Sequence, residues 1–501
     1  MTCGHSICDV CEAIFGFECP GVECQYEVQA CALCTSGRVV VRLKPPSAGV
    51  SILSIDGGGI RGVIPLEFLD RLQQIIGACP VQDLFDLAFG TSAGGIIVLG
   101  LFFRHWSIPH CTKLFEVLTK KFFRQRRSTD QTFFGSFRHT LKCWLQYGRY
   151  NVSTLESCLK ETFGPHSRMC DSVSNETTRA KVAVTASNIS DASAYVFSNY
   201  NGLGQRAKEC GYTHLRPQAV EDEPFVWQAG RATSAAPVLF QPAHIPNIGS
   251  FQDGFLPRLY RSFMSSLNGQ RAWRDLVNRL DEDCQDDYIR LNISLPDPEP
   301  EIDAVDHQMD SLRQSTHLQS QGDAEAKNAF VLLSSQFFFR LEGLPRKLTS
   351  GLYSCRGFIC CKLGGFVIVE ALKRVHPEEL SWILDNQTVA SMDMETDVCS
   401  LCHRYRKAVE FFVQDLETPL AISLRGVDDR TRRISAFPQS MKWFIEQQGL
   451  DNSFGNMNHG IPGRLTCRAY EQEKVPQRQK RKATWASPPK KRMKSWHSNW
   501  I

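Results

Sequence analysis

The sequence G-T-S-A-G at residues 90–94 constrains this chain more than any other feature. It fits the pattern G-x-S-x-G, in which a serine occupies a sharp turn between a strand and a helix. Residues 84–89 are short and apolar enough for a buried strand, and the residues after the motif can begin a packed helix. Gly90 and Gly94 suit a strained turn that leaves little room for neighbouring Cβ atoms. The pattern predicts that Ser92 stands at a helix N-terminus, which favours a developing oxyanion. A plain turn of small residues is the alternative.

Two further stretches offer groups that can act with Ser92. Residues 50–55 predict a strand, and the sequence D-G-G-G-I-R-G at residues 56–62 follows it, before an apolar helical pattern that begins near Pro65. A glycine-rich loop at the start of a helix presents backbone N–H groups that can bind a phosphate or an oxyanion. Farther along, the sequence S-F-Q-D-G places the Asp253 carboxylate at a turn, where it can serve as a general base.

In this order the three motifs resemble the patatin-like phospholipase family, and R-A-T-S-A-A-P at residues 231–237 resembles that family's segment before its aspartate. The resemblance implies an α/β fold, a three-layer α/β/α sandwich. It also implies a calcium-independent lipid acyl hydrolase of the phospholipase A type, acting on phospholipids or acylglycerols with no cofactor for catalysis. Ser92 would be the nucleophile and Asp253 the base of a Ser-Asp dyad without histidine. The residues of the implied oxyanion loop are Gly57, Gly58, Gly59, Arg61 and Gly62. One departure from the family is Phe255 after the D-G pair, where D-G-G or D-G-A is usual.

Two other classes of function deserve comparison. The glycine loop also fits G-x-G-x-x-G, the fingerprint of nucleotide-binding oxidoreductases. That fingerprint requires an acidic residue at the end of the next strand, and here the next strand leads to Thr91 and Ser92. The second alternative is an inactive patatin-like scaffold or a zinc-dependent interaction protein. The presence of both Ser92 and Asp253 favours an active enzyme.

The N-terminal segment is rich in cysteine, with a spacing that resembles the later part of a RING finger. C-x₂-C pairs are typical of zinc sites, and a module this small depends on metal for its folding energy. By this resemblance Cys3, His5, Cys31 and Cys34 would form one site, and Cys8 and Cys11 would belong to a second. The other pair of the second site would either lie before Met1, in a chain truncated at its start, or be replaced by Cys19 and Cys24. The sequence therefore predicts a structural zinc module that can bind a protein partner, against the alternative of a loose cysteine-rich leader.

The length of 501 residues suggests about two to four domains. No apolar run is long enough for a transmembrane helix, and the N-terminus lacks a signal-peptide pattern. We therefore expect a cytoplasmic protein that contacts membranes peripherally. The expected parts are the zinc module at 1–42, a linker at 43–49, the patatin-like domain at 50–270, a mixed α/β region of unassigned role at 271–475 and a basic disordered tail at 476–501.

Two segments are rich in cations. Aromatic residues are interleaved with Lys and Arg between residues 115 and 149, which suits a helical cap with buried aromatics, an anionic lipid interface or a nucleic-acid surface. Residues 471–501 contain nine Lys or Arg and two Glu, a net charge of +7. Such a tail can be solubilising, a nuclear-import signal or a membrane-binding arm. The nucleus is thus an alternative location, and nucleic acid is the least favoured partner.

The C-terminal half carries no recognisable catalytic motif. Its patterns predict strands at 288–293 and 337–341, helices at 377–384 and 441–448, and a proline-rich boundary at 296–301. The alternation of strands and helices before it predicts a mainly parallel sheet. The residues of this half that can bind metal are Cys355, Cys360, Cys361, Cys399, Cys402 and His403. Because they contain one C-x₂-C pair, buried free thiols are the favoured interpretation.

Overall fold

The structure is a computed structural model of the chain, and its helices, strands and sheets are those of the residues that it describes. These are residues 12, 16–19, 24–31, 33–35, 37–124, 150–170, 180–191, 193–200, 211–215, 222–237, 239–253, 269–295, 299–305, 307–320, 323–426 and 430–451. The expected basic tail lies outside them. So do Cys3, His5, Cys8 and Cys11 of the expected zinc module.

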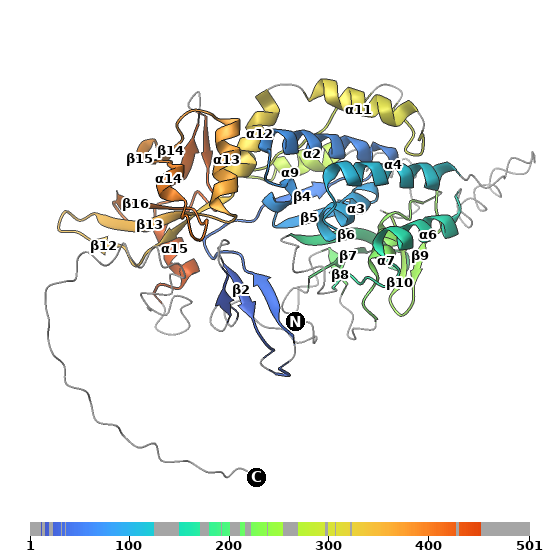
Figure 1. The fold of residues 1–501 in the computed structure, drawn as a ribbon, viewed down its shortest axis with the longest axis horizontal. Coiled ribbons are helices and arrows are strands. Elements are labelled where there is room, and N and C mark those ends of the chain that lie inside the picture. The colour runs from blue at the N-terminus through green and yellow to red at the C-terminus, as the bar shows by residue number, and fades with distance from the viewer. Residues whose placement is uncertain are drawn as a thin grey trace, which may run out of the picture. The chain divides into compact units, whose positions relative to one another are not determined.

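The N-terminal segment forms a small antiparallel sheet in the order β1-β2-β3. Its strands are β1 (Phe17–Glu18), β2 (Gln25–Val28) and β3 (Val39–Arg42). Cys31 is buried and Cys34 is exposed, and both lie in the connection between β2 and β3. The residues after β3 turn back at residues 46–47 and lead into the central sheet (Figure 1).

The central sheet contains seven strands and is mixed, not mainly parallel as the alternation of elements predicts. Parallel pairs join β4 to β5, β5 to β6 and β7 to β8, while β6 pairs antiparallel with β7 and β10, and β10 with β9. The strands are β4 (Ile52–Ile55), β5 (Leu87–Thr91), β6 (Lys181–Asn188), β7 (Ala194–Ser198), β8 (Tyr212–His214), β9 (Ala243–Ile245) and β10 (Gly249–Gln252). Short turns connect β6 to β7 and β9 to β10, and such turns permit only antiparallel neighbours. The expected α/β class is nevertheless correct.

Helices cover this sheet and bury its apolar side chains. In α2 (Val63–Ile76), residues Leu66, Leu69 and Leu72 recur at helical spacing and are buried in the main core. Figure 1 shows α2 and α11 above strands β4 and β5. The other helices around the sheet are η1 (Gly59–Gly62), η2 (Val81–Leu84), α3 (Ala93–Val98), the π-helix η3 (Leu99–Phe103), α4 (Ile108–Arg124), α6 (Val152–Phe163), α7 (Val226–Thr233), α9 (Gly269–Val277), α10 (Glu282–Gln285), α11 (His307–Gln319) and α12 (Asp323–Ser334).

The region that follows contains two further four-stranded sheets around an aromatic core. One contains β11 (Phe337–Leu341), β12 (Arg346–Lys347), β13 (Tyr353–Cys361) and β16 (Arg406–Val413). The other contains β14 (Ser381–Leu384), β15 (Gln387–Ser391), β17 (Ile422–Arg425) and β18 (Thr431–Arg433). The helices are α13 (Gly365–Val375), α14 (Met394–Asp397) and α15 (Met441–Gln448). The predicted strand at 337–341 and helix at 441–448 are therefore confirmed.

Two predicted elements are wrong in this region. Residues 381–384 form a strand, not the end of a helix, because they pair with both β15 and β17 and bury Trp382 completely. Such pairing overrides a weak local preference. Residues 288–293 form no strand: among the described strands β4 pairs only with β5, and both β4 and this segment line a cavity of about 1020 Å³.

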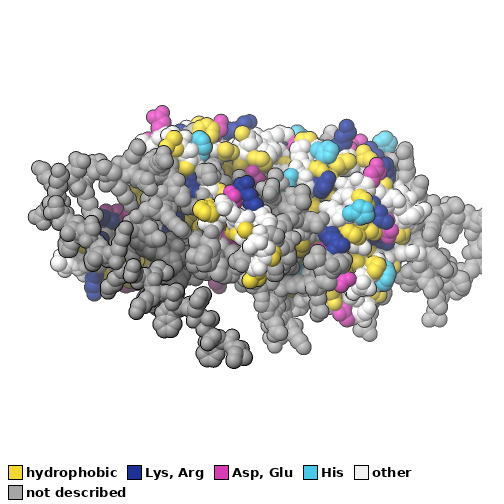
Figure 2. Space-filling view, turned by 60° about the horizontal axis from the view of Figure 1, so that its bottom comes forward, with side chains coloured by type: hydrophobic (Ala, Val, Ile, Leu, Met, Phe, Trp, Pro, Cys, Tyr) yellow, Lys and Arg dark blue, Asp and Glu magenta, His cyan; other side chains and the backbone are white. Residues whose placement is uncertain are grey.

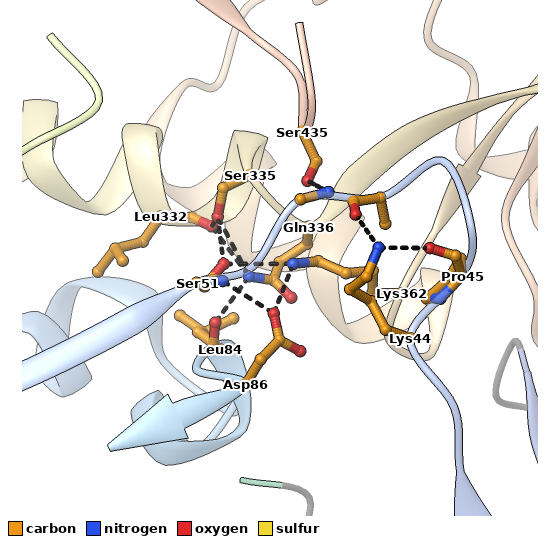
Figure 3. A network of polar contacts seen from close by, with 12 residues as sticks. Lys44, Pro45, Ser51, Leu84, Asp86, Leu332, Ser335, Gln336, Lys362 and Ser435 are labelled. Carbon is orange, nitrogen blue, oxygen red and sulfur yellow. Dashed lines mark hydrogen bonds and ion pairs between the residues drawn. The ribbon is translucent and has the colours of Figure 1, made fainter. Parts of the chain in front are cut away.

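A buried polar junction connects the central sheet to the C-terminal sheets (Figure 3). The Lys362 ammonium, with a side chain only 1% exposed, lies 3.0 Å from the Asp86 carboxylate at the start of β5 and 3.2 Å from Ser51 Oγ. Ser51 N–H donates to the same carboxylate at 2.9 Å, and Gln336 donates to the Leu84 carbonyl at 2.9 Å. The two regions are thus joined by satisfied polar contacts.

Candidate active site

Ser92 occupies a strained turn between β5 and α3, as its motif predicts. Its φ of 56° and ψ of −125° lie in a region that side chains rarely adopt, at a typical cost of about 1–3 kcal/mol. The turn is tight, since a Cβ on Gly94 would meet the Ile55 carbonyl oxygen at 2.2 Å and one on Gly90 would meet that of Gly94 at 2.4 Å. Both flanking positions therefore require glycine.

The segment 231–237 holds both polar side chains of the site in place. Ser92 N–H donates to Thr233 Oγ1 at 2.9 Å, which fixes the backbone of the turn. Asp253 N–H donates to the Ala235 carbonyl at 3.0 Å, immediately after β10. One short segment thus fixes the backbones of Ser92 and Asp253, which lie 161 positions apart in the numbering.

Asp253 is buried, and its environment favours the neutral carboxylic acid. Burial raises the pKa of Asp253 to about 7, while a hydrogen bond from the Ser92 side chain acts in the opposite direction. The carboxyl group therefore titrates near neutral pH and is in contact with the serine hydroxyl. A group with this pKa can accept a proton and return it in the same reaction cycle.

The glycine-rich loop approaches Ser92 from β4. Gly58 and Gly59 have φ values of 150° and 59°, and they line the same cavity as Ser92 and Asp253. Among the described residues no acceptor is found for the backbone N–H of Gly58 or Gly59, whereas Ile60 N–H donates to the Ile302 carbonyl. These two N–H groups are thus available to bind an oxyanion.

The remaining residues of the expected loop have structural contacts. A Cβ on Gly57 would lie 2.8 Å from Ser92 Cβ, so glycine permits the close approach of loop and turn. Arg61 pairs with Glu299 at 2.9 Å and donates to the Pro300 carbonyl at 2.9 Å. Gly62 precedes α2. Arg61 therefore holds a distant segment against the loop.

The cavity beside Ser92 is small and largely apolar, with a volume of about 60 Å³. Its aromatic and aliphatic wall includes Phe115, Leu118, Phe122, Phe123, Leu239 and Phe240. Four of these belong to α4, so this helix presents aromatic side chains to the cavity, as a cap with buried aromatics would. Residues 125–149 of the aromatic and basic segment lie outside the described residues.

No histidine in the described part of the chain lines this cavity. His307, His317, His376 and His403 lie elsewhere, and His459 and His497 fall outside the described residues. Within the described ranges, Asp253 is accordingly the base nearest to Ser92.

Of the cysteines expected in the zinc module, the structure describes Cys31 and Cys34 and the alternative pair Cys19 and Cys24. Within the described residues no group of three or more His, Cys, Asp or Glu is arranged to hold a metal ion. Cys31 accepts a hydrogen bond from Leu33 N–H at 3.4 Å. Cys355, Cys360 and Cys361 are buried in β13, and burial raises the thiol pKa to about 11 for Cys355 and about 12 for Cys361. These three behave as core thiols.

Two residues of the site were not singled out by sequence reasoning. Thr233 lies within a quoted motif, but only the fold shows that its hydroxyl accepts the Ser92 N–H. Ile302 lines the cavity from a segment next to the predicted proline-rich boundary, and no local pattern signals it.

The sequence comparisons agree with the geometry. Residues 53–256 match the family model for patatin-like phospholipases. The chain is 31% identical over 210 residues to the 85/88 kDa calcium-independent phospholipase A2 of Mus musculus, covering 41% of this chain and 22% of that protein. It is 33% identical over 234 residues to calcium-independent phospholipase A2-gamma of Homo sapiens, covering 46% of this chain and 27% of the relative. A cGAMP-activated phospholipase of Escherichia coli (strain TW11681) is 29% identical over 252 residues, covering 49% of this chain and 61% of that protein.

Residues 53–256 are therefore a patatin-like phospholipase domain, which confirms the resemblance for this part of the chain. The chain spans only about a quarter of the length of the two mammalian relatives. No helix among the described residues is both long and apolar enough to cross a membrane.

Proposed function

We propose that this protein is a calcium-independent lipid acyl hydrolase that cleaves carboxylic ester bonds of phospholipids or acylglycerols. Ser92 is the nucleophile, Asp253 is the general base and acid, and the backbone N–H groups of Gly58 and Gly59 bind the oxyanion. The observation that carries this proposal is the contact between the Ser92 hydroxyl and a buried carboxyl group of raised pKa, beside two backbone N–H groups for which the described residues supply no acceptor.

In the first half of the reaction, Ser92 Oγ attacks the ester carbonyl carbon while its proton passes to the Asp253 carboxylate. The carbonyl oxygen becomes an oxyanion bound by the two glycine N–H groups and favoured by the N-terminus of α3. The tetrahedral intermediate collapses and breaks the bond to the alcohol, which takes the proton from Asp253. The products of this half are the free alcohol, such as a lysophospholipid, and an acyl ester on Ser92.

In the second half, Asp253 removes a proton from water, and the resulting hydroxide attacks the acyl-serine carbonyl. The oxyanion forms at the same donors, and the Ser92–acyl bond breaks with return of the proton to Oγ. The fatty acid leaves, and the enzyme is regenerated with the atoms and charges it had at the start. No metal ion is needed to balance either half.

Labelling with a fluorophosphonate tests the nucleophile directly. The full chain should be labelled once, at Ser92, and Ser92→Ala should lose both the label and the hydrolysis of a short-chain ester and a phospholipid. Ser234 is the rival hydroxyl in the cavity, but it donates to the Gly230 carbonyl at 2.7 Å. Label that persists in Ser92→Ala contradicts the assignment.

We also propose that Cys3, His5, Cys31 and Cys34 bind one structural zinc ion, with Cys8 and Cys11 in an incomplete second site. Support comes from the C-x₂-C spacing and from the Leu33 N–H that donates to Cys31 Sγ, as backbone groups commonly do to a metal-bound thiolate. Elemental analysis of the purified chain should find about one zinc, which Cys31→Ser with Cys34→Ser removes. Cys361→Ser, a change in a buried core thiol, is the control. Absence of zinc in the purified chain contradicts the proposal.

Peripheral membrane binding is the third part of the proposal. Figure 2 shows acidic and basic side chains interspersed on the described part of one face, so that part carries both signs of charge. Support comes instead from the net +7 of residues 471–501. The full chain should sediment with vesicles that contain phosphatidylserine, and a chain ending at residue 470 should do so less. Equal sedimentation of the two chains contradicts a role for the tail.

A further inference from the structure

A segment outside the matched domain closes one side of the catalytic cavity. Residues 299–305 follow the predicted boundary, and Ile302 from this segment lines the same cavity as Ser92 and Asp253. The Ile302 carbonyl accepts the Ile60 N–H at 2.9 Å and lies so near Gly59 that an added Cβ would meet it at 2.0 Å. The segment is thus in direct contact with the glycine loop that would bind the oxyanion.

Two side chains of the domain hold the segment at its ends. At its start, Arg61 pairs with the Glu299 carboxylate and donates to the Pro300 carbonyl, both at 2.9 Å. After Ile302, the buried carboxyl of Asp303 accepts a hydrogen bond from Tyr150 Oη at 2.6 Å. The segment is a fixed wall in this structure.

The second of these contacts connects the segment to an aromatic cluster. The Tyr150 ring lies 5.2 Å from that of Phe123 and 5.7 Å from that of Phe240, measured between centroids. Phe123 and Phe240 line the cavity on its apolar side. Ile302 and this cluster therefore enclose the cavity together.

The volume of the cavity beside Ser92 is too small for a long acyl chain. About 60 Å³ holds only a few water molecules, whereas sites for drug-sized ligands measure roughly 300–1,000 Å³. The apolar wall suits an acyl chain. The space left between the side chains of the wall limits the length of the acyl chain that fits. Ile302 is the part of the wall that comes from outside the domain.

We propose that segment 299–305 is an acyl-length gate, in which the volume of Ile302 beside Gly59 disfavours long acyl chains at Ser92. This inference rests on the proposed ester hydrolysis at Ser92 and adds the substrate selectivity of the same site. Ile302 determines specificity through its volume, and Tyr150 acts as a positioning residue through Asp303. Short esters fit beside Ile302 and reach Ser92.

The test compares kcat/KM for p-nitrophenyl butyrate and p-nitrophenyl palmitate, the latter in mixed micelles. Ile302→Ala should raise the ratio of long-chain to short-chain values about tenfold, and Ile302→Val should raise it less. Tyr150→Phe, which removes the hydroxyl that holds Asp303, should raise the ratio as well. Ile302→Phe should lower it. Val389→Ala, a change in β15 outside the cavity, is the matched control and should leave the ratio unchanged.

Failure of the gate and failure of the proposed function give different results. If butyrate is hydrolysed but Ile302→Ala, Ile302→Val and Tyr150→Phe all keep the wild-type ratio within about twofold, the gate is wrong and the hydrolase stands. If the wild-type chain neither hydrolyses butyrate nor reacts with fluorophosphonate at Ser92, the proposed function is wrong and the gate falls with it. The conservative Ile302→Val change keeps the test decisive should Ile302→Ala fail to fold.

Discussion

Two regions of this molecule bury an ionisable side chain, with opposite consequences. At the junction of the sheets, burial lowers the pKa of Lys362, and the nearby charge of Asp86 acts against this shift. Beside Ser92, burial raises the pKa of Asp253 to about 7, and within the described residues the hydrogen bond from the neutral Ser92 hydroxyl is what opposes the shift. The buried Lys362 ammonium is thus paired with an opposite charge, whereas no cation from the described part of the chain opposes the pKa shift of Asp253.

The difference separates a structural use of burial from a reactive one. A buried ion pair with satisfied hydrogen bonds joins two parts of a fold, and removing one member leaves an uncompensated charge. A buried carboxyl without a cation is held near its titration point, where it can exchange protons. The predictions below test whether the two regions differ in this way.

The largest expected effect is on activity. Asp253→Asn should lower kcat/KM for ester hydrolysis by about 10⁴-fold or more, since loss of a catalytic carboxylate in comparable hydrolases costs that much. Lys362→Met, which removes the other buried ionisable group, should change kcat/KM by less than about fivefold in the folded fraction. Steady-state kinetics on a short-chain ester measures both. If both variants lose kcat/KM to a similar extent, the two buried groups do not differ in their role in activity.

The same Asp253→Asn change should stabilise the fold. Because the folded pKa is about 7 and the usual value is 3.8, the stability contributed by the neutral acid is fully present at low pH and is lost as pH rises through 7. The side chain of the variant is neutral at every pH. The free energy of unfolding of the variant should therefore exceed that of the wild type by an amount that grows with pH, up to about 4 kcal/mol above pH 7. Urea unfolding at pH 5 and pH 8 measures the gain. An equal difference at both pH values contradicts the raised pKa.

Breaking the junction should destabilise the fold. Lys362→Met leaves the Asp86 carboxylate without its cation and should lower the free energy of unfolding by about 3 kcal/mol. Adding Asp86→Asn should recover part of this loss, because the uncompensated charge is removed. Urea unfolding of the two single variants and the double variant gives the coupling free energy. If the losses of unfolding free energy in the two single variants simply add in the double variant, Lys362 and Asp86 do not stabilise each other.

The smallest expected effect concerns the support of the turn. Thr233→Val removes the acceptor of the Ser92 N–H at nearly constant volume and should lower kcat about tenfold, whereas Thr233→Ser keeps the hydroxyl and most of the activity. The pH midpoint of kcat/KM should stay near 7 in both variants, since Asp253 is unchanged. A shift of that midpoint in Thr233→Val would mean that Thr233 also sets the environment of the base.

The local motifs were sufficient to predict the parts of the site that depend on backbone strain. Gly90 and Gly94 identify the turn at Ser92, and the run at 56–62 identifies the loop, because only glycine fits such close approaches. Strand β4 and helix α2 form where their apolar patterns predict, and β5 overlaps its predicted run but begins at Leu87, not at residue 84. The antiparallel pairing of β7, β9 and β10 was not predicted, and residues 381–384 were predicted as helix, since pairing depends on which strands become neighbours.

The sequence by itself thus determined the features that depend on local backbone geometry. These are the serine turn, the glycine loop and the presence of a carboxylate after a strand. Only the tertiary structure decided that Asp253 is buried and hydrogen-bonded to Ser92, that Thr233 supports the turn, and that Ile302 lines the cavity. These properties depend on distances between residues far apart in the chain. Burial, pKa and cavity volume arise from that packing, and no local pattern contains them.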